Sequence, residues 1–290
     1  MIKQASDFSA LTKKAIGVIL LGLMLFSGSV AKAGSEAGIP VLLYHHVGND
    51  DGGLPRLTVT AAEFERQMQL LYQAGFETIT PEQLVGYMNG EKVSLPEKPI
   101  MFTFDDGYDD NYICAVPILK EYGFTATFLV VGINVDKDRR LSARQVRDMA
   151  QTGFSVGGHS MTHRDLTQLS KAAVRNEISA NKRQLEQITG RQSLLFSYPY
   201  GYYNLPVWKA AEASGYQGAF TVLSGLNNPG RDNIFLLRRI PIFNTTDFDT
   251  LLTRLNRNLT SPKLLDYLPE IIDSELLNQK NISDYKVNDE

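Results

Sequence analysis

Hydrophobic residues along this chain gather into short runs that alternate with segments of helical periodicity. The first run, residues 39–44, is continuously apolar, as is typical of a strand buried on both faces of a parallel sheet. A similar run at residues 100–104 ends in a cluster of carboxylates. About seven strand–helix repeats follow one another, and this alternation favours a single parallel barrel over an open sheet.

The remaining elements are placed by the same patterns. Further strands are expected at residues 76–79, 125–131, 154–156, 194–198, 216–222 and 236–242. Helices are expected at residues 61–74, 81–88, 111–122, 143–151, 170–188, 205–214 and 247–259. Thr60 and Glu63 have the spacing of a capping box at the first of these helices. A Gly-rich phosphate loop is absent from the sequence, so a nucleotide-binding sheet is the weaker alternative.

The two ends of the chain differ from its middle. Basic residues precede an apolar stretch at residues 15–30, and Ala31-Lys32-Ala33 fits the cleavage site of a secretory signal peptide. We therefore expect cleavage near Ala33 and a secreted or periplasmic protein. An uncleaved membrane anchor is the alternative, although the stretch is shorter than the roughly 20 residues of a membrane span. Residues 34–260 should form one domain, and residues 261–290 a helical or frayed tail.

Charge and cysteine content narrow the classes of partner. The net charge of the chain is −3, and removal of residues 1–33, with four lysines and one aspartate, makes it −6. Such a chain is a poor ligand for nucleic acid or anionic lipid, so neither is expected as a partner. Cys114 is the only cysteine, which excludes an intrachain disulfide and favours a buried structural thiol.

The four histidines of the chain all follow predicted strands. His45 and His46 come after the first strand, and His159 and His163 come after the strand at residues 154–156. Because side chains at the C-terminal ends of barrel strands converge on one mouth, these imidazoles are expected to lie near one another.

Two adjacent carboxylates, Asp105 and Asp106, end the strand at residues 100–104. Neighbouring residues of a regular strand point to opposite faces, so both can serve one site only if the strand stops there, and Gly107 supplies the backbone freedom for that stop. A carboxylate pair at a strand end can combine a proton-transfer group with a metal ligand. The next two carboxylates, Asp109 and Asp110, are expected at the N-terminus of the following helix.

His159 and His163 have i, i+4 spacing, which places both imidazoles on one face if the backbone turns helically there. With Asp106 as a third ligand, they predict a divalent metal site with open positions for water and substrate. Zinc is our first expectation for this metal, and iron, cobalt and nickel fit the same ligands.

Three ordered motifs closely resemble those of a known family. Residues 103–107 (TFDDG), 159–163 (HSMTH) and 197–201 (SYPYG) resemble the first three motifs of NodB-type polysaccharide deacetylases, carbohydrate esterase family 4. The resemblance extends over about residues 39–242 and implies a distorted (β/α)7 barrel. It also implies metal-dependent hydrolysis of N-acetyl groups on sugars.

The resemblance implies a role for each motif residue. Asp105 looks like the general base, and Asp106, His159 and His163 look like the metal ligands. The backbone N–H of Tyr200 would help to hold the oxyanion of the tetrahedral intermediate.

The sequence departs from the usual family pattern in two places. Ser197 stands where the family has an arginine that contacts the catalytic aspartate, and no histidine follows His163 to act as the late general acid. Residues 42–47 (LLYHHV) resemble the N-terminal Tyr-His-x-Val segment of the circularly permuted poly-β-1,6-N-acetylglucosamine deacetylase branch. The first and last strands of a closed barrel are neighbours, so His45 becomes the candidate general acid.

Two questions about neighbouring residues follow from these departures. His46 is expected to point away from the site, because adjacent strand residues face opposite sides. Arg238 or Arg239 is open as a replacement for the missing arginine, and a solvated or structural arginine is the expectation for both.

The sequence therefore predicts an exported, metal-dependent deacetylase that converts an N-acetylglucosamine glycan, either poly-β-1,6-linked or chitin-like, to acetate and glucosamine units. Tyr108, Tyr198 and Tyr202 are candidates for stacking on sugar rings. The N-acetylated polysaccharide is the expected partner. Whether the protein also works with membrane-associated export or synthesis machinery is left open by the sequence. The alternatives are a hydrolase of another ester or C–N bond, such as an acetylxylan esterase, and a glycan-binding barrel without turnover.

Overall fold

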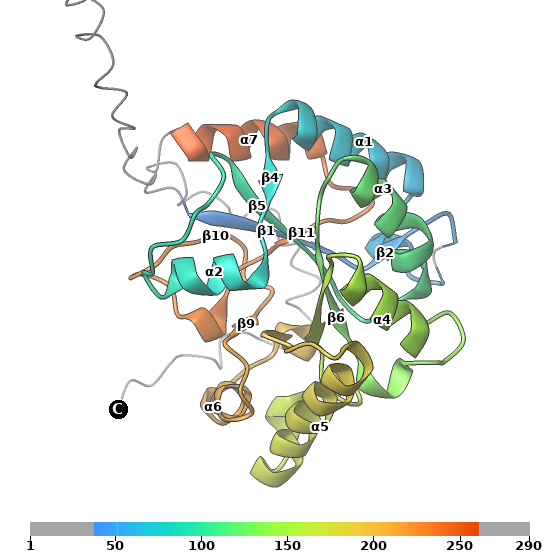
Figure 1. Cartoon of the computed structure of the whole chain (residues 1–290), viewed down its shortest axis with the longest axis vertical. Coiled ribbons are helices and arrows are strands. Elements are labelled where there is room, and N and C mark those ends of the chain that lie inside the picture. Colours follow the sequence, from blue (N-terminus) through green and yellow to red (C-terminus); the bar gives the residue numbers. More distant parts are fainter. Residues whose placement is uncertain (1–37, 51, 261–290) are drawn as a thin grey trace, which may run out of the picture. The chain divides into compact units, whose positions relative to one another are not determined.

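A curled, mostly parallel sheet lies at the centre of the described part of the chain, residues 38–50 and 52–260, in this computed structural model (Figure 1). Its strands lie in the order β10-β1-β5-β6-β7-β8-β9, with β4 paired to β5 and β11 paired to β1. All these pairs are parallel except β1 with β10. The strands are β1 (Ile39–Tyr44), β4 (Glu77–Thr78), β5 (Pro99–Phe104), β6 (Thr127–Val130), β7 (Ser155–Gly158), β8 (Leu195–Ser197), β9 (Gly218–Phe220), β10 (Leu226–Asn227) and β11 (Ile240–Pro241).

The sheet closes on itself through the segment that contains β11. Leu237 forms a parallel bridge with Phe220 at the end of β9, and Ile240 pairs with Leu42 of β1. The parallel circuit therefore runs through β1, β5, β6, β7, β8, β9 and β11. This confirms the predicted barrel in a distorted form, and it makes the first strand and the last strand neighbours.

Helices cover the outside of the sheet (Figure 1). They are α1 (Ala61–Gln73), α2 (Pro81–Met88), α3 (Val116–Glu121), α4 (Ala143–Gln151), α5 (Lys171–Thr189), α6 (Leu205–Ala213) and α7 (Phe248–Thr260). Each lies close to its predicted position. The sequence did not predict the π-helical turn Asn111–Ala115 that precedes α3, nor the small separate sheet of β2 (His46–Val47) and β3 (Thr58–Val59).

Both faces of the strands are covered by apolar side chains, which explains their unbroken hydrophobic runs. On β5, Phe102 and Phe104 belong to the large cluster that packs under the outer helices. Met101, between them in sequence, belongs to a second cluster with Leu129 and Leu195. Because side chains alternate along a strand, the next residue in phase with Met101 beyond the end of β5 is Asp105.

Helix caps and chain ends complete the comparison with the predicted elements. Thr60 accepts the backbone N–H of Glu63 at the start of α1, but the Glu63 carboxylate pairs with Arg66, 2.8 Å away, instead of closing a capping box. The predicted signal peptide and the predicted tail at residues 261–290 lie outside the described residues. Among the described helices, none has the length and hydropathy that a membrane span needs.

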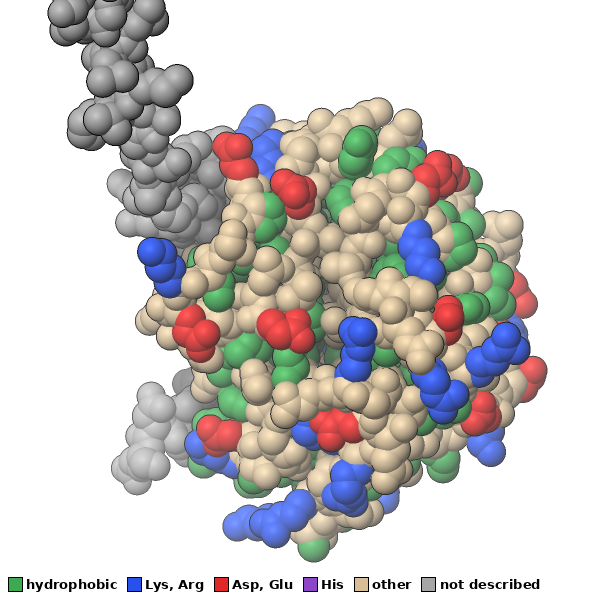
Figure 2. All heavy atoms as spheres, viewed as in Figure 1, with side chains coloured by type: hydrophobic (Ala, Val, Ile, Leu, Met, Phe, Trp, Pro, Cys, Tyr) green, Lys and Arg blue, Asp and Glu red, His purple; other side chains and the backbone are tan. Residues whose placement is uncertain are grey.

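Figure 2 shows the same face as Figure 1 with every heavy atom drawn. Acidic and basic side chains are interspersed over the described part of this face, and hydrophobic side chains are scattered between them. No histidine of the described residues is visible from this side.

Candidate active site

The residues that the sequence singles out lie at the C-terminal ends of neighbouring strands. His45 follows β1, Asp105 and Asp106 follow β5, and His159 follows β7. Ser197 is the last residue of β8. The parallel pairing of these strands brings all of the ends to one edge of the barrel, as expected for this architecture.

The backbone separates the two carboxylates of the pair. The Asp105 amide still donates to the Tyr44 carbonyl at 3.0 Å, so Asp105 keeps the strand direction and its side chain remains inside. Asp106 then takes a positive φ of 74°, and Gly107 follows with 73°. The left-handed turn therefore begins one residue earlier than the glycine, and aspartate is among the residues that tolerate it.

Asp106, His159 and His163 form a compact group of three donors. Asp106 Oδ1 lies 3.4 Å from His159 Nε2 and 3.2 Å from His163 Nε2, and the two nitrogens are 3.2 Å apart. Within the described residues this is the only His, Cys, Asp and Glu group that could hold a metal ion. The edge is partly open, because the His163 side chain is 26% exposed.

The backbone from His159 to His163 is not helical, so the i, i+4 spacing does not by itself place the two imidazoles on one face. Ser160 and His163 adopt left-handed φ values of 62° and 56°. The Ser160 hydroxyl accepts the His163 backbone N–H at 2.9 Å and holds this irregular turn. The two imidazoles meet because of these left-handed residues and not because of helical spacing.

The donor set fits a divalent metal such as zinc. Ligand distances of about 2.0–2.2 Å place neighbouring donors roughly 2.8–3.6 Å apart for ligand angles between about 90° and tetrahedral, and the three separations in this group fall within that range. His159 Nδ1 lies 2.8 Å from the Ser197 carbonyl, so Nδ1 carries the proton and Nε2 presents a lone pair to the group. Two imidazole nitrogens and a carboxylate oxygen converging at such distances require a cation or protons between them.

Asp105 lies beside this group and is held by a buried arginine. Arg239 donates through Nη1 and Nη2 to both oxygens of Asp105, at 2.7 and 2.8 Å, and its side chain is fully buried. Ser197 accepts from Arg239 at 2.8 Å and donates to Asp105 at 3.0 Å. The expectation of a solvated arginine was wrong for Arg239, which is buried and reaches Asp105 from the segment just before β11.

These contacts determine the ionisation of both carboxyl groups. Burial raises the pKa of Asp105, but the Arg239 charge, followed by His159, outweighs burial and leaves this pKa below its ordinary value. Burial also raises the pKa of Asp106, whereas hydrogen bonds from His159 and His163 lower it, and the result is well below the ordinary range. Both groups are therefore carboxylates at neutral pH.

His45 lies at the same edge, at the end of β1. Its Nδ1 atom is buried and has no hydrogen-bond partner among the described residues. Burial lowers the pKa of His45 more than Asp106 and Asp105 raise it. Asn111 donates to the His45 carbonyl at 2.7 Å and thereby fixes the bend of the backbone between β1 and β2.

His46 points away from the metal group, in line with the expectation for it. Its Nδ1 lies 2.5 Å from Asp110 Oδ2, and its ring packs on Tyr108 with centroids 3.4 Å apart. Asp110 Oδ1 accepts from Asn111 at 2.8 Å. Asp110 lies at the N-terminus of the helical segment, as predicted, but its side chain bonds His46 and Asn111 and makes no capping hydrogen bond.

The candidate sugar-binding tyrosines differ in exposure. Tyr198 is fully buried and donates to the Phe235 carbonyl at 3.0 Å, so the prediction that it stacks on a sugar was wrong. Tyr108 is 6% exposed and lies under the Arg140 guanidinium, 4.0 Å from the ring centroid, which leaves it little surface for a substrate.

Tyr200 is the aromatic residue that the structure presents at the site. It has a positive φ of 60°, and its ring is 55% exposed, 4.7 Å from the His163 ring and 5.7 Å from the Tyr202 ring. A positive φ in a residue other than glycine is a strained conformation of the kind that occurs at functional sites. The sequence predicted a role for the backbone of Tyr200 and did not predict the exposure of its side chain.

Comparisons with known proteins identify the family of this chain. The family model described as polysaccharide deacetylase matches residues 92–219. The chain is 34% identical over 194 residues to the "Putative polysaccharide deacetylase YxkH" of Bacillus subtilis, covering 67% of this chain and 68% of that protein. It is also 28% identical over 211 residues to the poly-beta-1,6-N-acetyl-D-glucosamine N-deacetylase of Staphylococcus epidermidis, covering 67% of this chain and 71% of that protein.

A solved structure shares the fold. The Streptococcus pyogenes deacetylase PplD in complex with acetate superposes with a TM-score of 0.69 at 27% sequence identity. The match covers 75% of this chain and 98% of that chain.

Proposed function

Because this chain belongs to the polysaccharide deacetylase family, hydrolases of amide C–N bonds, we propose that the edge formed by β1, β5, β7, β8 and β11 is its active site. In this proposal it removes acetyl groups from N-acetylglucosamine units of a polysaccharide, with a bound divalent metal. The observation that carries the proposal is the contrast between two adjacent carboxylates. Asp106 faces two imidazoles, while Asp105 is held apart by Arg239.

The donors Asp106, His159 and His163 would hold the divalent ion. The chemistry supplied by such an ion is Lewis acidity toward the acetyl carbonyl and the attacking water. The protein sets the orientation of the ligands: the Ser197 carbonyl fixes the His159 tautomer, and the Ser160 hydroxyl fixes the His163 backbone.

Asp105 takes the proton of the attacking water. Its lowered pKa keeps it ionised and ready to accept, and the bidentate contact with Arg239 fixes the direction of its oxygens. Arg239 also compensates the charge of the carboxylate inside the barrel, so that Asp105 stays a carboxylate in a buried setting.

His45 and Tyr200 complete the reaction. The Tyr200 backbone N–H donates to the developing oxyanion, an effect typically worth about 3–4 kcal/mol per donor. His45 protonates the departing sugar amine, which is a poor leaving group without a proton. The products are acetate and a glucosamine unit.

Separate variants of the two carboxylate roles test this assignment. We expect Asp105→Asn to bind one metal ion per chain and to lose at least about 100-fold in acetate release, which is the usual scale for a general base. His163→Ala should lose both the metal and the activity. Metal content and acetate release are measured on the same preparations, and normal turnover in Asp105→Asn would refute the assigned base.

For the substrate, we propose poly-β-1,6-N-acetylglucosamine. Support comes from the Tyr-His-x-Val segment at the end of β1 and from the likeness to the Staphylococcus epidermidis protein of that name. Acetate release is compared between β-1,6-linked and β-1,4-linked N-acetylglucosamine oligomers and acetylated xylan, each with zinc, iron, cobalt and nickel. A preference for β-1,4-linked oligomers or for xylan would contradict the proposed substrate.

We also propose that the protein is exported, on the evidence of the apolar stretch at residues 15–30 and the Ala31-Lys32-Ala33 site. The intact mass of the protein recovered outside the cytoplasm should correspond to a chain that starts at Gly34. Recovery of the uncleaved chain in the membrane fraction would instead identify an anchor.

A further inference from the structure

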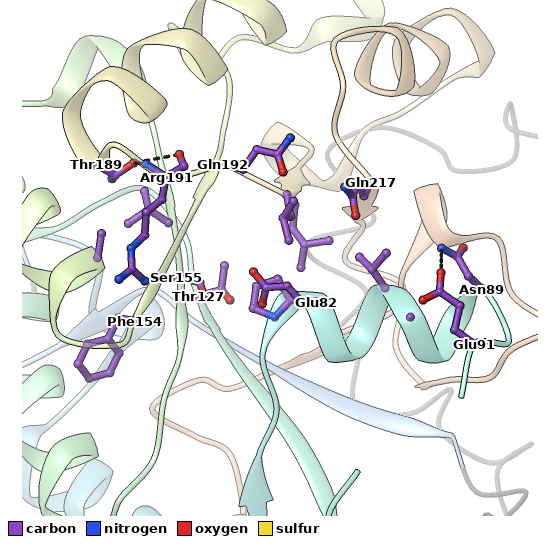
Figure 3. A pocket seen from close by; sticks show the side chains of 17 residues that line it. Glu82, Asn89, Glu91, Thr127, Phe154, Ser155, Thr189, Arg191, Gln192 and Gln217 are labelled. Carbon is purple, nitrogen blue, oxygen red and sulfur yellow. Dashed lines mark hydrogen bonds between the residues drawn. The ribbon is translucent and has the colours of Figure 1, made fainter. Parts of the chain in front are cut away.

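A cavity of about 550 Å³ lies at the end of the barrel opposite the candidate active site. It is lined where strands begin: Thr127 opens β6, Ser155 opens β7, and Gln217 directly precedes β9. One side of α2, the loop that follows α2 and the loop after α5 form other walls of the cavity (Figure 3). On β7, Ser155 precedes His159 by four residues, about 13 Å along a strand. None of the described catalytic residues lines this cavity.

One polar atom in the cavity is buried without a partner. Thr127 is 1% exposed, and its Oγ1 makes no hydrogen bond within the described residues. Register places Thr127 beside Thr103 of β5 and Ser155 of β7, so all three side chains share one side of the sheet. A buried hydroxyl normally has a partner, and an unpaired one that lines a cavity points to a polar molecule bound there.

Charged and amide side chains reach into the same cavity. In Figure 3, Glu82 enters from the first turn of α2, and Arg191 extends from the loop after α5. Neither side chain forms a hydrogen bond or ion pair with another described residue, and the same holds for the Gln217 amide. Glu91 supplies a second carboxylate, which contacts only the Asn89 amide among the described side chains, at 3.4 Å.

We propose that this cavity is a second, non-catalytic binding site for an amino sugar with a free amine. The two carboxylates outnumber the one guanidinium, which favours a cationic ligand over an anion. The hydroxyl and amide side chains that line the cavity can form hydrogen bonds with the hydroxyl groups of a sugar. The cavity volume lies within the range of about 300–1,000 Å³ that small-molecule sites occupy. That such a ligand is a product of this same enzyme rests on the proposed function, whereas the recognition chemistry of the cavity does not.

The test is a calorimetric titration of the full chain with a β-linked glucosamine disaccharide. Glu82→Lys places a cation where the ligand amine is expected and should weaken binding at least tenfold. Glu121→Lys is the matched control, because Glu121 is an exposed residue of α3 that does not line the cavity. Equal affinities in these two variants would overturn the site.

A second variant and a second readout keep the proposal independent of folding and of catalysis. Thr127→Val preserves shape and removes the unpaired hydroxyl, so it should weaken binding severalfold while the melting temperature stays the same or rises. Unchanged affinity together with a lower melting temperature would contradict the proposal. Acetate release from N-acetylglucosamine oligomers is measured in parallel: binding of the glucosamine disaccharide by a protein that releases no acetate from these oligomers would refute the proposed function and leave the cavity assignment standing.

Discussion

At the scale of single residues, the contact between Arg239 and Asp105 is the main departure from the family pattern. Ser197 stands at the position of the usual arginine, and its hydroxyl accepts a hydrogen bond from Arg239 and donates one to Asp105. A guanidinium fork matches both oxygens of a carboxylate, and Arg239 is held further by the Thr221 carbonyl at 2.9 Å. An arginine thus still contacts the proposed base, but it comes from the segment just before β11 and not from the position of Ser197.

Arg239→Lys tests this fork directly. Lysine keeps the charge but cannot bond both Asp105 oxygens and Ser197 at once, so kcat should fall about 10–100-fold with metal content unchanged. Arg238→Lys is the matched control, since Arg238 is partly exposed and pairs with Asp232 at 3.3 Å. Steady-state acetate release on the two variants measures the difference, and equal rates would remove Arg239 from the mechanism.

The buried pair also predicts how stability depends on pH. The pKa of Asp105 is lowered in the folded protein, so its contribution is fully present above the unfolded value of about 3.9 and is lost as pH falls through the folded pKa. Asp105→Asn removes this dependence and, by leaving Arg239 unpaired, should cost about 3–5 kcal/mol at neutral pH. Urea unfolding between pH 7 and pH 3 measures both, and parallel curves below pH 5 for the two proteins would argue against the assignment.

The sequence alone identified site residues only where they belong to a short motif. The Asp-Asp-Gly run and the histidine spacing indicated Asp106, His159 and His163, and the structure brings these three together, while their roles stay predictions. Arg239 lies 134 residues from Asp105, and nothing in its surroundings in sequence distinguishes it from Arg238. An arginine inside an otherwise apolar strand pattern was the available signal, and only the fold shows which of the two faces inward.

At the scale of elements, β7 shows how packing overrides local preference. The sequence predicted a strand that ends at residue 156, because glycine is a poor strand former, but the strand continues through Gly157 and Gly158. A side chain at Gly158 would meet the Tyr216 hydroxyl at 2.0 Å and Asn181 Oδ1 at 2.6 Å. Asn181 of α5 accepts the His159 backbone N–H at 3.0 Å, so the glycine allows α5 to approach and fix the proposed ligand.

Gly158→Ala should therefore destabilise the protein by at least about 1–3 kcal/mol and weaken metal binding, because the added methyl pushes against fixed groups. Gly48→Ala is a matched control, since a methyl there meets its nearest atom at an ordinary 3.6 Å. Thermal unfolding with and without metal compares the two, and equal melting temperatures would show that α5 can move to accommodate the methyl.

At the scale of the whole molecule, the proposed metal ligands connect two strands of the barrel, because Asp106 follows β5 and both His159 and His163 follow β7. If a divalent ion is bound at about 100 times its Kd, it stabilises the fold by about 2.7 kcal/mol. Chelation should then lower the melting temperature by roughly 5–10 °C, and added zinc should restore it. His163→Ala should show no response to the chelator, and a chelator effect of the same size in that variant would place the metal elsewhere.

The barrel itself was predictable from the alternation of elements, but the way it closes was not. The sequence indicated one strand at residues 236–242. The structure instead has a short 3₁₀ turn, Ile234–Leu236, a single bridge at Leu237 and the two-residue β11. Pro241 has no N–H to donate and cannot continue a regular ladder, which limits β11 to a short pairing with β1.

This closure has a consequence for a chain that is still being made. Synthesis proceeds from the N-terminus, and a nascent chain that has emerged only as far as residue 220 already carries His45, Asp105, Asp106 and both histidine ligands. It lacks Arg239 and the segment that joins β9 to β1, so neither the buried ion pair nor the ring of strands can form. A chain that ends before this segment is therefore expected to release no acetate, because its proposed base has no buried partner.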